Sequence, residues 1–401
     1  MFYTFLFLWL LKDSVAVGKE IEETLDAEET IRHYGYQVEK RFVTTEDGYT
    51  IEMQRIPYGR DPRTIDGCSQ RPAVFLMHGL FATSYEFIFN LPSQSAAYIF
   101  ADAGFDVWLG NVRGTEYGLY HSRFNSSEPG FWNFSFYDHA HFDLRRQIEY
   151  VLEETGQESL FYVGHSQGTT MMFARLAEAD VEWQRKIKIF FALGPTAGFL
   201  NPLMPLALLE GDYLQRLIQF TLDGKFGIVP VTMPKELTKA VADICASEFL
   251  SHLCVTTFTS RREKLGQFNE TRLPIIVSHY PSATSTLNIL HWMQVFKYHE
   301  LRKLDLGSER NQVAYGTEEA PKLDISNIET PTILYFSGDD KVTDAVDVKE
   351  ILIKQMGSAL IEHYELDHFS HIDYAVGLRA ADEVYRPIVY RIYQELRGRR
   401  C

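Results

Sequence analysis

The sequence predicts an α/β fold in which a mostly parallel, doubly wound sheet is interrupted by a helical insertion. Apolar runs of strand length alternate with helical segments along most of the chain, which is typical of parallel sheets. Between residues 198 and 322 no core strand is predicted, and the chain is instead helical, apolar and aromatic. At residues 160–170 an apolar strand turns into a helix through a serine flanked by glycines. We therefore expect a cap inserted between the sixth and seventh strands, with the serine at the edge of the sheet.

The first elements predict an antiparallel beginning of the sheet. Residues 25–35 form a short helix capped by Asp26, and two strands at 37–44 and 49–56 are joined by a turn at 46–48.

The later strands are mostly apolar runs, as expected for strands that are covered on both faces. We predict them at residues 73–77, 105–109, 160–163, 187–193, 331–336 and 361–366. Between them we predict helices at 93–103, 143–154 and 171–178, the second of which has one apolar face.

The N-terminus predicts a secretory signal at residues 1–18. Residues 2–11 are almost wholly apolar and small residues follow at 14–18. Ten apolar residues are too few to span a bilayer, so no transmembrane span is expected in the mature chain, and an uncleaved anchor is the alternative. The predicted organisation is then the first part of the core at 19–197, the cap or lid at 198–322 and the second part of the core at 323–401.

The composition is that of a globular protein. The 401 residues are 45% hydrophobic and 23% charged, with a formal net charge of −15. Because phosphate binding needs a clustered basic surface, this acidic chain is not expected to bind nucleic acid. The composition predicts no particular oligomeric state.

Three N-x-S/T sequons fit a secreted chain, at Asn125, Asn133 and Asn269. Asn133 is the doubtful one, because it lies inside the aromatic run 131–137.

Four cysteines are present. Cys245 and Cys254 enclose a short loop that a disulfide would pin, whereas Cys68 and Cys401 have no obvious partner. Free thiols are the alternative for all four. No CxxC motif or histidine cluster suggests a metal site.

Ser166 stands between Gly164 and Gly168 in a G-x-S-x-G pattern that follows the strand at 160–163. This is the sequence of a nucleophile elbow, where the serine is held in a strained turn and glycines avoid collision with the adjacent strand and helix. A serine hydroxyl is a poor nucleophile near neutral pH, so it needs a base and a group that orients the base.

The partners of such a serine are expected at later strand ends, first an acid and then a histidine. The strand at 331–336 is followed by Asp339, Asp340 and Asp344. We favour Asp340, because the acid usually stands two residues past the turn glycine. After the strand at 361–366 stand His368 and His371, and local reasoning does not separate them.

Donors for the developing oxyanion are expected from two backbone groups. One is the N–H of Gln167, which follows the serine. The other is the N–H of Leu80, in the loop after the first central strand.

Further motifs extend over nearly the whole mature chain. They include Thr45-Glu46-Asp47-Gly48-Tyr49, His78-Gly79-Leu80, Asp106-Val107-Trp108-Leu109-Gly110-Asn111, Phe131-Trp132, Tyr162-Val163-Gly164-His165-Ser166-Gln167-Gly168-Thr169 and His291-Trp292. In these motifs the chain resembles the acid lipases, the group of gastric and lysosomal lipases and their secreted relatives.

The resemblance implies an α/β-hydrolase fold and a role for each matching residue. Ser166 would be the nucleophile, Asp340 the acid, and Leu80 and Gln167 the oxyanion donors. The family's histidine precedes a hydrophobic residue, an aspartate and an aromatic, which His371 does. The resemblance therefore implies His371 as the base.

It also implies a disulfide in the cap, where Cys245 and Cys254 stand. The implied activity is a secreted or lysosomal lipase that hydrolyses acylglycerols or sterol esters at a lipid-water interface, without metal or organic cofactor. The alternatives are an esterase for short soluble esters and a catalytically silent lipid-binding relative.

Overall fold

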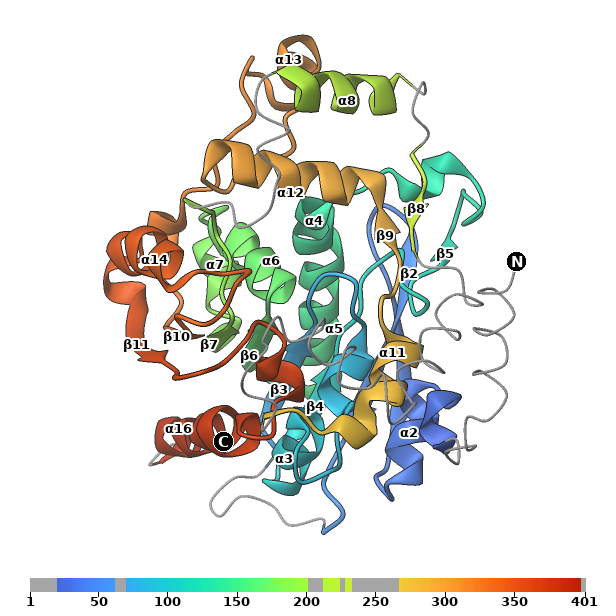
Figure 1. Ribbon diagram of the computed structural model, residues 1–401, viewed down its shortest axis with the longest axis vertical. Helices are drawn as coiled ribbons and strands as arrows, with labels where there is room; N and C mark the ends of the chain where they lie inside the picture. Colours follow the sequence, from blue (N-terminus) through green and yellow to red (C-terminus); the bar gives the residue numbers. More distant parts are fainter. Residues whose placement is uncertain (1–19, 62–69, 201–211, 224–227, 233–266, 398–401) are drawn as a thin grey trace, which may run out of the picture.

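A computed structural model describes residues 20–61, 70–200, 212–223, 228–232 and 267–397 (Figure 1). The predicted signal at 1–18 lies outside these residues. So do Cys68, Cys245, Cys254 and Cys401, and their pairing stays a prediction.

A single large mixed sheet forms the centre of the described chain. Its strand order is β1-β2-β4-β3-β6-β7-β10-β11, and the short β5 pairs with β2. The strands are β1 Glu39–Thr44, β2 Tyr49–Ile56, β3 Ala73–Met77, β4 Asp106–Leu109, β5 Tyr120–His121, β6 Leu160–His165, β7 Ile187–Leu193, β10 Thr332–Phe336 and β11 Leu360–Glu365. From β4 to β11 all neighbours along this order are parallel, whereas β1, β2 and β5 are antiparallel to their partners. The predicted doubly wound α/β fold, with its antiparallel beginning, is confirmed.

The register aligns the carboxyl ends of the central strands. Met77 at the end of β3 pairs with Gly164 of β6, and His165 pairs with Leu193 at the end of β7. Tyr335 of β10 also pairs with Leu193. The loops that leave β3, β6 and β10 therefore start at the same edge of the sheet, where ligands bind in open α/β folds.

Both faces of the central strands are covered, as their apolar sequences predict. In β3, Val74 and Leu76 pack in one hydrophobic cluster with α2 (Ala27–His33), α3 (Ala96–Asp102), α11 (Leu273–His279) and α16 (Arg386–Leu396). Phe75 and Met77 pack in a second cluster with α5 (Arg145–Thr155) and α6 (Gln167–Leu176). This alternation places one layer of helices on each face.

The described part of the chain contains the following α-helices. They are α2 Ala27–His33, α3 Ala96–Asp102, α4 Phe136–Asp138, α5 Arg145–Thr155, α6 Gln167–Leu176, α7 Val181–Gln184, α8 Asp212–Leu222, α11 Leu273–His279, α12 Thr286–Tyr298, α13 Ser308–Tyr315, α14 Ala345–Asp347, α15 Asp373–Val376 and α16 Arg386–Leu396. Short 3-10 turns include η1 Ile21–Glu23, η2 Ser84–Ile88, η3 Pro129–Trp132, η7 Glu270–Arg272, η8 Ile325–Asn327 and η10 Gly357–Ala359, and π-helical turns lie at η4 His139–Leu144, η9 Val348–Ile353 and η11 Ala381–Tyr385.

Three predicted helices differ from the structure at their starts. The helix expected at 171–178 begins at Gln167, directly after the serine. The helix expected at 93–103 begins only at Ala96, because residues 92–94 form a turn. The helix expected at 143–154 is the end of a longer one, in which α4, the π-turn η4 and α5 follow one another from Phe136 to Thr155. A π-turn carries an extra residue per turn, which shifts the apolar period that predicts a helix start.

The segment 198–322, which is predicted to form the cap, packs against two different parts of the structure. Figure 1 shows α12 above α4 and α6, with α8 and α13 above α12. Leu214 and Ile218 of α8 pack on Leu287 and Leu290 of α12. By contrast α11 lies beside α2 and packs in the main core (Figure 1). β8 Pro230–Val231 and β9 Thr284–Ser285 form a small antiparallel sheet, which links the chain after α8 to the chain before α12.

None of the helices in the described part of the chain has the length and apolar character that a membrane span requires.

Candidate active site

Ser166 lies at the turn between β6 and α6. Its backbone is strained, with φ 50° and ψ −119°, in a region that residues other than glycine rarely adopt. The crowding predicted for the flanking glycines is present. A Cβ on Gly168 would lie 2.3 Å from the carbonyl oxygen of Met77, and one on Gly164 would lie 2.9 Å from the backbone of Gly168.

His371 lies within hydrogen-bond distance of both Ser166 and Asp340. Nε2 of His371 is 2.7 Å from Oγ of Ser166, and Nδ1 is 2.8 Å from Oδ2 of Asp340. With the proton on Nδ1, the imidazole donates to the carboxylate and accepts from the serine hydroxyl. The side chain of His371 is 13% exposed and that of Asp340 is fully buried. A buried carboxylate thus orients the imidazole, and the other ring nitrogen faces the hydroxyl of the half-buried Ser166.

The Asp340 carboxylate is fixed by its own loop. Oδ1 accepts from the N–H groups of Val342 (2.8 Å) and Thr343 (2.9 Å), and Oδ2 accepts from the Thr343 hydroxyl (2.7 Å). Burial alone would raise the pKa of Asp340, but the charge of His371 and these donors hold it below its usual range. The carboxylate therefore stays ionised in acidic solution.

The alternative acids and the alternative histidine lie elsewhere. Asp339 pairs with Nδ1 of His368 at 2.9 Å, and both side chains are largely exposed. Asp344 caps α14 by accepting from the N–H of Val346. Neither acid contacts His371 in the described hydrogen bonds.

The two expected oxyanion donors flank the serine. Gln167 is the first residue of α6, so its N–H has no partner within the helix and lies at the positive end of the helix dipole. Leu80 follows Gly79, and a Cβ on Gly79 would lie 3.1 Å from Cβ of Ser166. The loop after β3 therefore packs directly on the nucleophile turn.

The side chain of Gln167 is held from a distant helix. Its Oε1 accepts from Nδ2 of Asn288 (3.0 Å) and from the indole N–H of Trp292 (2.7 Å), both on α12. His139, at the start of η4, lies 3.5 Å from Nε2 of Gln167.

The predicted glycosylation sites differ in exposure. Asn125 and Asn133 are exposed, although the aromatic neighbours of Asn133 are buried. Asn269 is half-buried, and its Oδ1 accepts from the N–H and hydroxyl of Thr271. Modification of all three stays a prediction.

Comparison with known proteins gives matches over nearly the whole chain. Residues 27–91 match the model of a partial alpha/beta-hydrolase lipase region, and residues 72–377 match the model of the alpha/beta hydrolase fold. The chain is 37% identical to lipase lipl-5 of Caenorhabditis elegans, covering 97% of each chain. It is 34% identical to the lysosomal acid lipase/cholesteryl ester hydrolase of Homo sapiens, covering 96% of each. The chain belongs to the acid lipase family of α/β hydrolases.

The fold of this family member is also similar to a crystal structure of a candidate lipase from Sulfolobus solfataricus. The TM-score is 0.54 at 14% identity, covering 89% of this chain and 99% of the other. At that identity the likeness concerns the fold alone.

Sequence reasoning missed several residues of the site in this acid lipase. Thr343 was overlooked beside the candidate acid, although a hydroxyl three residues after an aspartate often bonds to it. Asn288 had no local signal, and the His291-Trp292 motif gave no role for Trp292, since the two residues lie 121 and 125 residues from Gln167 along the chain.

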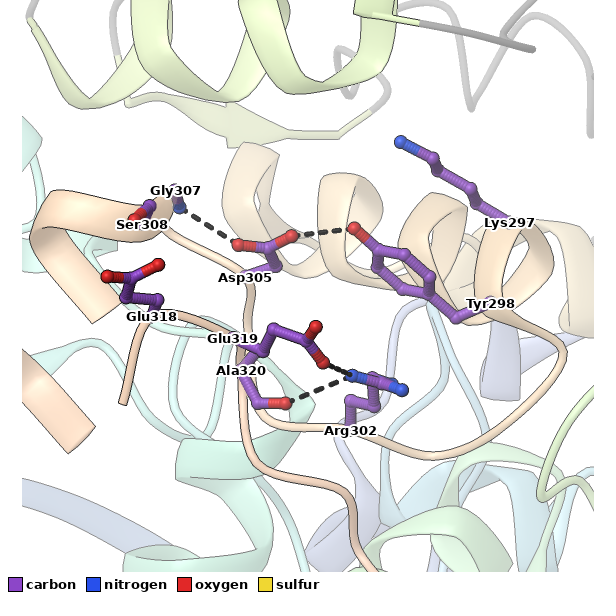
Figure 2. Close-up of a pocket in the computed structure, with 9 residues that line it drawn as sticks. All are labelled: Lys297, Tyr298, Arg302, Asp305, Gly307, Ser308, Glu318, Glu319 and Ala320. Atoms are coloured by element: carbon purple, nitrogen blue, oxygen red, sulfur yellow. Dashed lines mark hydrogen bonds and ion pairs between the residues drawn. The ribbon is translucent and has the colours of Figure 1, made fainter. Parts of the chain in front are cut away.

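A separate pocket of about 490 Å³ lies between α12, α13 and residues 318–320, and it contains none of these site residues (Figure 2). Several of its polar groups contact one another. Asp305 accepts from the Tyr298 hydroxyl (2.6 Å) and from the N–H of Gly307 (2.9 Å), and Arg302 pairs with Glu319 (Figure 2). These contacts belong to the packing between α12 and α13.

Proposed function

We propose that this chain is a lipase that hydrolyses carboxylic esters of lipids through a Ser-His-Asp acyl-enzyme mechanism. The observation that carries the proposal is the 2.7 Å contact between Oγ of Ser166 and Nε2 of His371, with Asp340 on the other ring nitrogen. A hydroxyl, a base and a buried acid in this order meet the requirements for nucleophilic catalysis.

In the proposed reaction Ser166 attacks the ester carbonyl while His371 takes the hydroxyl proton. Asp340 stabilises the imidazolium, and the N–H groups of Leu80 and Gln167 bind the oxyanion. His371 then protonates the leaving alcohol. A water molecule repeats the sequence on the acyl-enzyme and releases the fatty acid.

The substrate class rests on the family. The human relative named above is called a cholesteryl ester hydrolase as well as an acid lipase, and we propose sterol esters or acylglycerols at a lipid-water interface as the substrates here. The apolar helices α8 and α12 support this proposal, because a cap of this character suits a cleft for acyl chains.

The test compares wild type with Ser166→Ala on emulsions of a long-chain triacylglycerol and a cholesteryl ester, and on a short soluble ester. The variant should lose at least about 10³-fold in kcat on every substrate. Ser326→Ala, which removes an exposed serine of η8, is the matched control. Residual hydrolysis by Ser166→Ala at the wild-type rate would refute the mechanism.

The same assay separates the alternatives. A preference for the short ester without activation by the emulsion would indicate an esterase. Lipid binding without turnover by the wild type would indicate a silent relative, against which the complete Ser166, His371 and Asp340 arrangement argues.

We also propose that the chain enters the secretory pathway and is secreted or lysosomal, with cleavage of residues 1–18, glycans on the three sequons and a disulfide between Cys245 and Cys254. The cap boundaries at 198–322 remain part of this proposal. Intact-mass measurement of the secreted protein before and after deglycosylation and reduction tests each modification.

A further inference from the structure

Two buried titratable side chains lie directly behind the nucleophile turn. Glu86 belongs to η2, and His165 is the last residue of β6, next to Ser166. Their side chains are 8% and 4% exposed, and Oε1 of Glu86 lies 2.7 Å from Nδ1 of His165. The proposed mechanism uses neither of them.

The pair connects the three loops that carry the proposed machinery. The second carboxylate oxygen of Glu86 accepts from the N–H of Gly79, in the loop that precedes Leu80 (2.9 Å). On the other side, Nε2 of His165 lies 2.8 Å from the backbone carbonyl oxygen of His371. One chain of hydrogen bonds thus joins the oxyanion loop, the nucleophile strand and the loop of the base.

Both ring nitrogens of His165 face oxygen atoms that accept hydrogen bonds. A neutral imidazole has only one N–H, so beside an ionised Glu86 one of the two contacts would set a lone pair against an oxygen. Two protons on the ring and a charge on Glu86 satisfy both contacts. Burial alone would lower the pKa of His165, but Glu86 raises it above its usual range; burial would raise the pKa of Glu86, but His165 lowers it.

We propose that Glu86 and His165 are a positioning pair that fixes the oxyanion loop and the base loop relative to Ser166. The inference rests on the proposed function of Ser166 and His371. The pair touches neither substrate nor reacting atoms. It acts through Gly79 and through the backbone of His371, whose side chain must meet the serine hydroxyl.

The reason to expect an effect on rate is geometric. Glu86 holds the N–H of Gly79 and the ring of His165, which in turn bonds to the carbonyl of His371. Loss of Glu86 therefore lets the oxyanion loop and the base loop move relative to the nucleophile. A displacement of about 1 Å in a catalytic group can cost about 100-fold in rate. Ground-state binding of the lipid is expected to change little, because both side chains are buried.

The experiment compares Glu86→Ala with Glu86→Gln. The amide oxygen of the glutamine can accept from the N–H of Gly79, and its NH₂ group can donate to Nδ1 of His165. His165 then needs only one proton, on Nε2. We expect Glu86→Ala to lose about 100-fold in kcat with KM within about threefold, and Glu86→Gln to recover at least about tenfold of that loss.

Asp106→Ala and Asp106→Asn are the matched controls. Asp106 is a buried carboxylate paired bidentately with Arg55, at the start of β4 and therefore at the opposite end of the sheet from the site. Both controls should lower Tm while keeping kcat within about threefold of wild type. Equal kcat losses in Glu86→Ala and Asp106→Ala would reduce the pair to a structural role and overturn the proposal.

Each rate is divided by the concentration of active sites, measured as the serine that reacts with a phosphonate inhibitor. If Ser166→Ala keeps its activity, the proposed function fails; if Ser166→Ala is inactive but Glu86→Ala matches wild type, only the positioning pair fails. Should Glu86→Ala not fold, Glu86→Gln and His165→Gln replace it. The expected order of kcat is then wild type, Glu86→Gln and His165→Gln at constant KM, and equal kcat in all three overturns the proposal.

Discussion

Replacement of Asp340 by asparagine provides the sharpest test of the proposed triad. Oδ1 accepts two backbone N–H groups, from Val342 and Thr343, so the amide oxygen of an asparagine must take that place. The amide NH₂ then occupies the Oδ2 position and donates to Nδ1 of His371. The imidazole is driven into the tautomer that carries its proton on Nε2, and it can no longer accept from Ser166.

The expected loss follows from this tautomer. A serine triad held in the wrong tautomer loses about 10⁴-fold in kcat, which corresponds to about 5 kcal/mol in the activation free energy. The assay is kcat on a soluble chromogenic ester at about pH 7, with KM measured in the same experiment. Circular dichroism and Tm verify that the variant is folded.

Two neighbouring aspartates provide controls of the same chemistry. Asp344→Asn keeps the cap of α14, because asparagine caps helices as well as aspartate does. Asp339→Asn weakens the exposed pair with His368. Each should keep kcat within about threefold. If Asp340→Asn retained more than about a tenth of the wild-type kcat, or Asp339→Asn lost as much, the assignment of the acid would be wrong.

Three further changes test other parts of the structure. The folded-state pKa of Glu86 is lowered and that of His165 is raised, relative to ordinary values of 4.5 and 6.5. The pair therefore stabilises the fold most between these values, and its contribution fades as pH falls through the pKa of folded Glu86 or rises through that of folded His165. The Tm gap between wild type and Glu86→Gln should be wider at about pH 5.5 than at about pH 8.5, and equal gaps would contradict this. Gly168→Ala should destabilise the protein by about 1–3 kcal/mol in chemical unfolding, because its Cβ would lie 2.3 Å from a backbone oxygen of β3; an unchanged midpoint would disprove the crowding. Trp292→Phe removes one donor to Gln167 and should lower kcat/KM by about 2- to 10-fold, whereas an unchanged value would remove Trp292 from the site.

Much of the fold could be predicted because its signals are local. The apolar run of β3 and the strand, serine and helix around Ser166 are each visible within about ten residues. Since the carboxyl ends of parallel strands lie at one edge of a sheet, the order of the strands also predicts that Ser166, Asp340 and His371 approach one another. The choice between His368 and His371 came from the family resemblance, because both follow the same strand.

What escaped prediction depends on contacts between distant parts of the chain. Glu86 and His165 are 79 residues apart, and His165 and the His371 carbonyl are 206 apart. A buried glutamate in a 3-10 turn has no periodic signature, and the histidine before the nucleophile serine reads locally as one more strand residue. The start of the helix before α5 was missed for a different reason, since the π-turn η4 breaks the 3.6-residue apolar period.

The same difference between local and distant contacts applies to the way the site residues are fixed in position. The carboxylate of Asp340 is fixed by its own loop, but His371 is tied through its backbone to His165, and Gln167 is tied through its side chain to α12. Local folding can therefore place Asp340 correctly, while the proposed base His371 and the proposed oxyanion donor Gln167 still depend on tertiary contacts. Substitutions at those contacts should change kcat more than KM, because they move reacting groups without removing a surface that binds substrate. Substitutions that only destabilise the sheet at the other end should lower Tm and leave both constants unchanged.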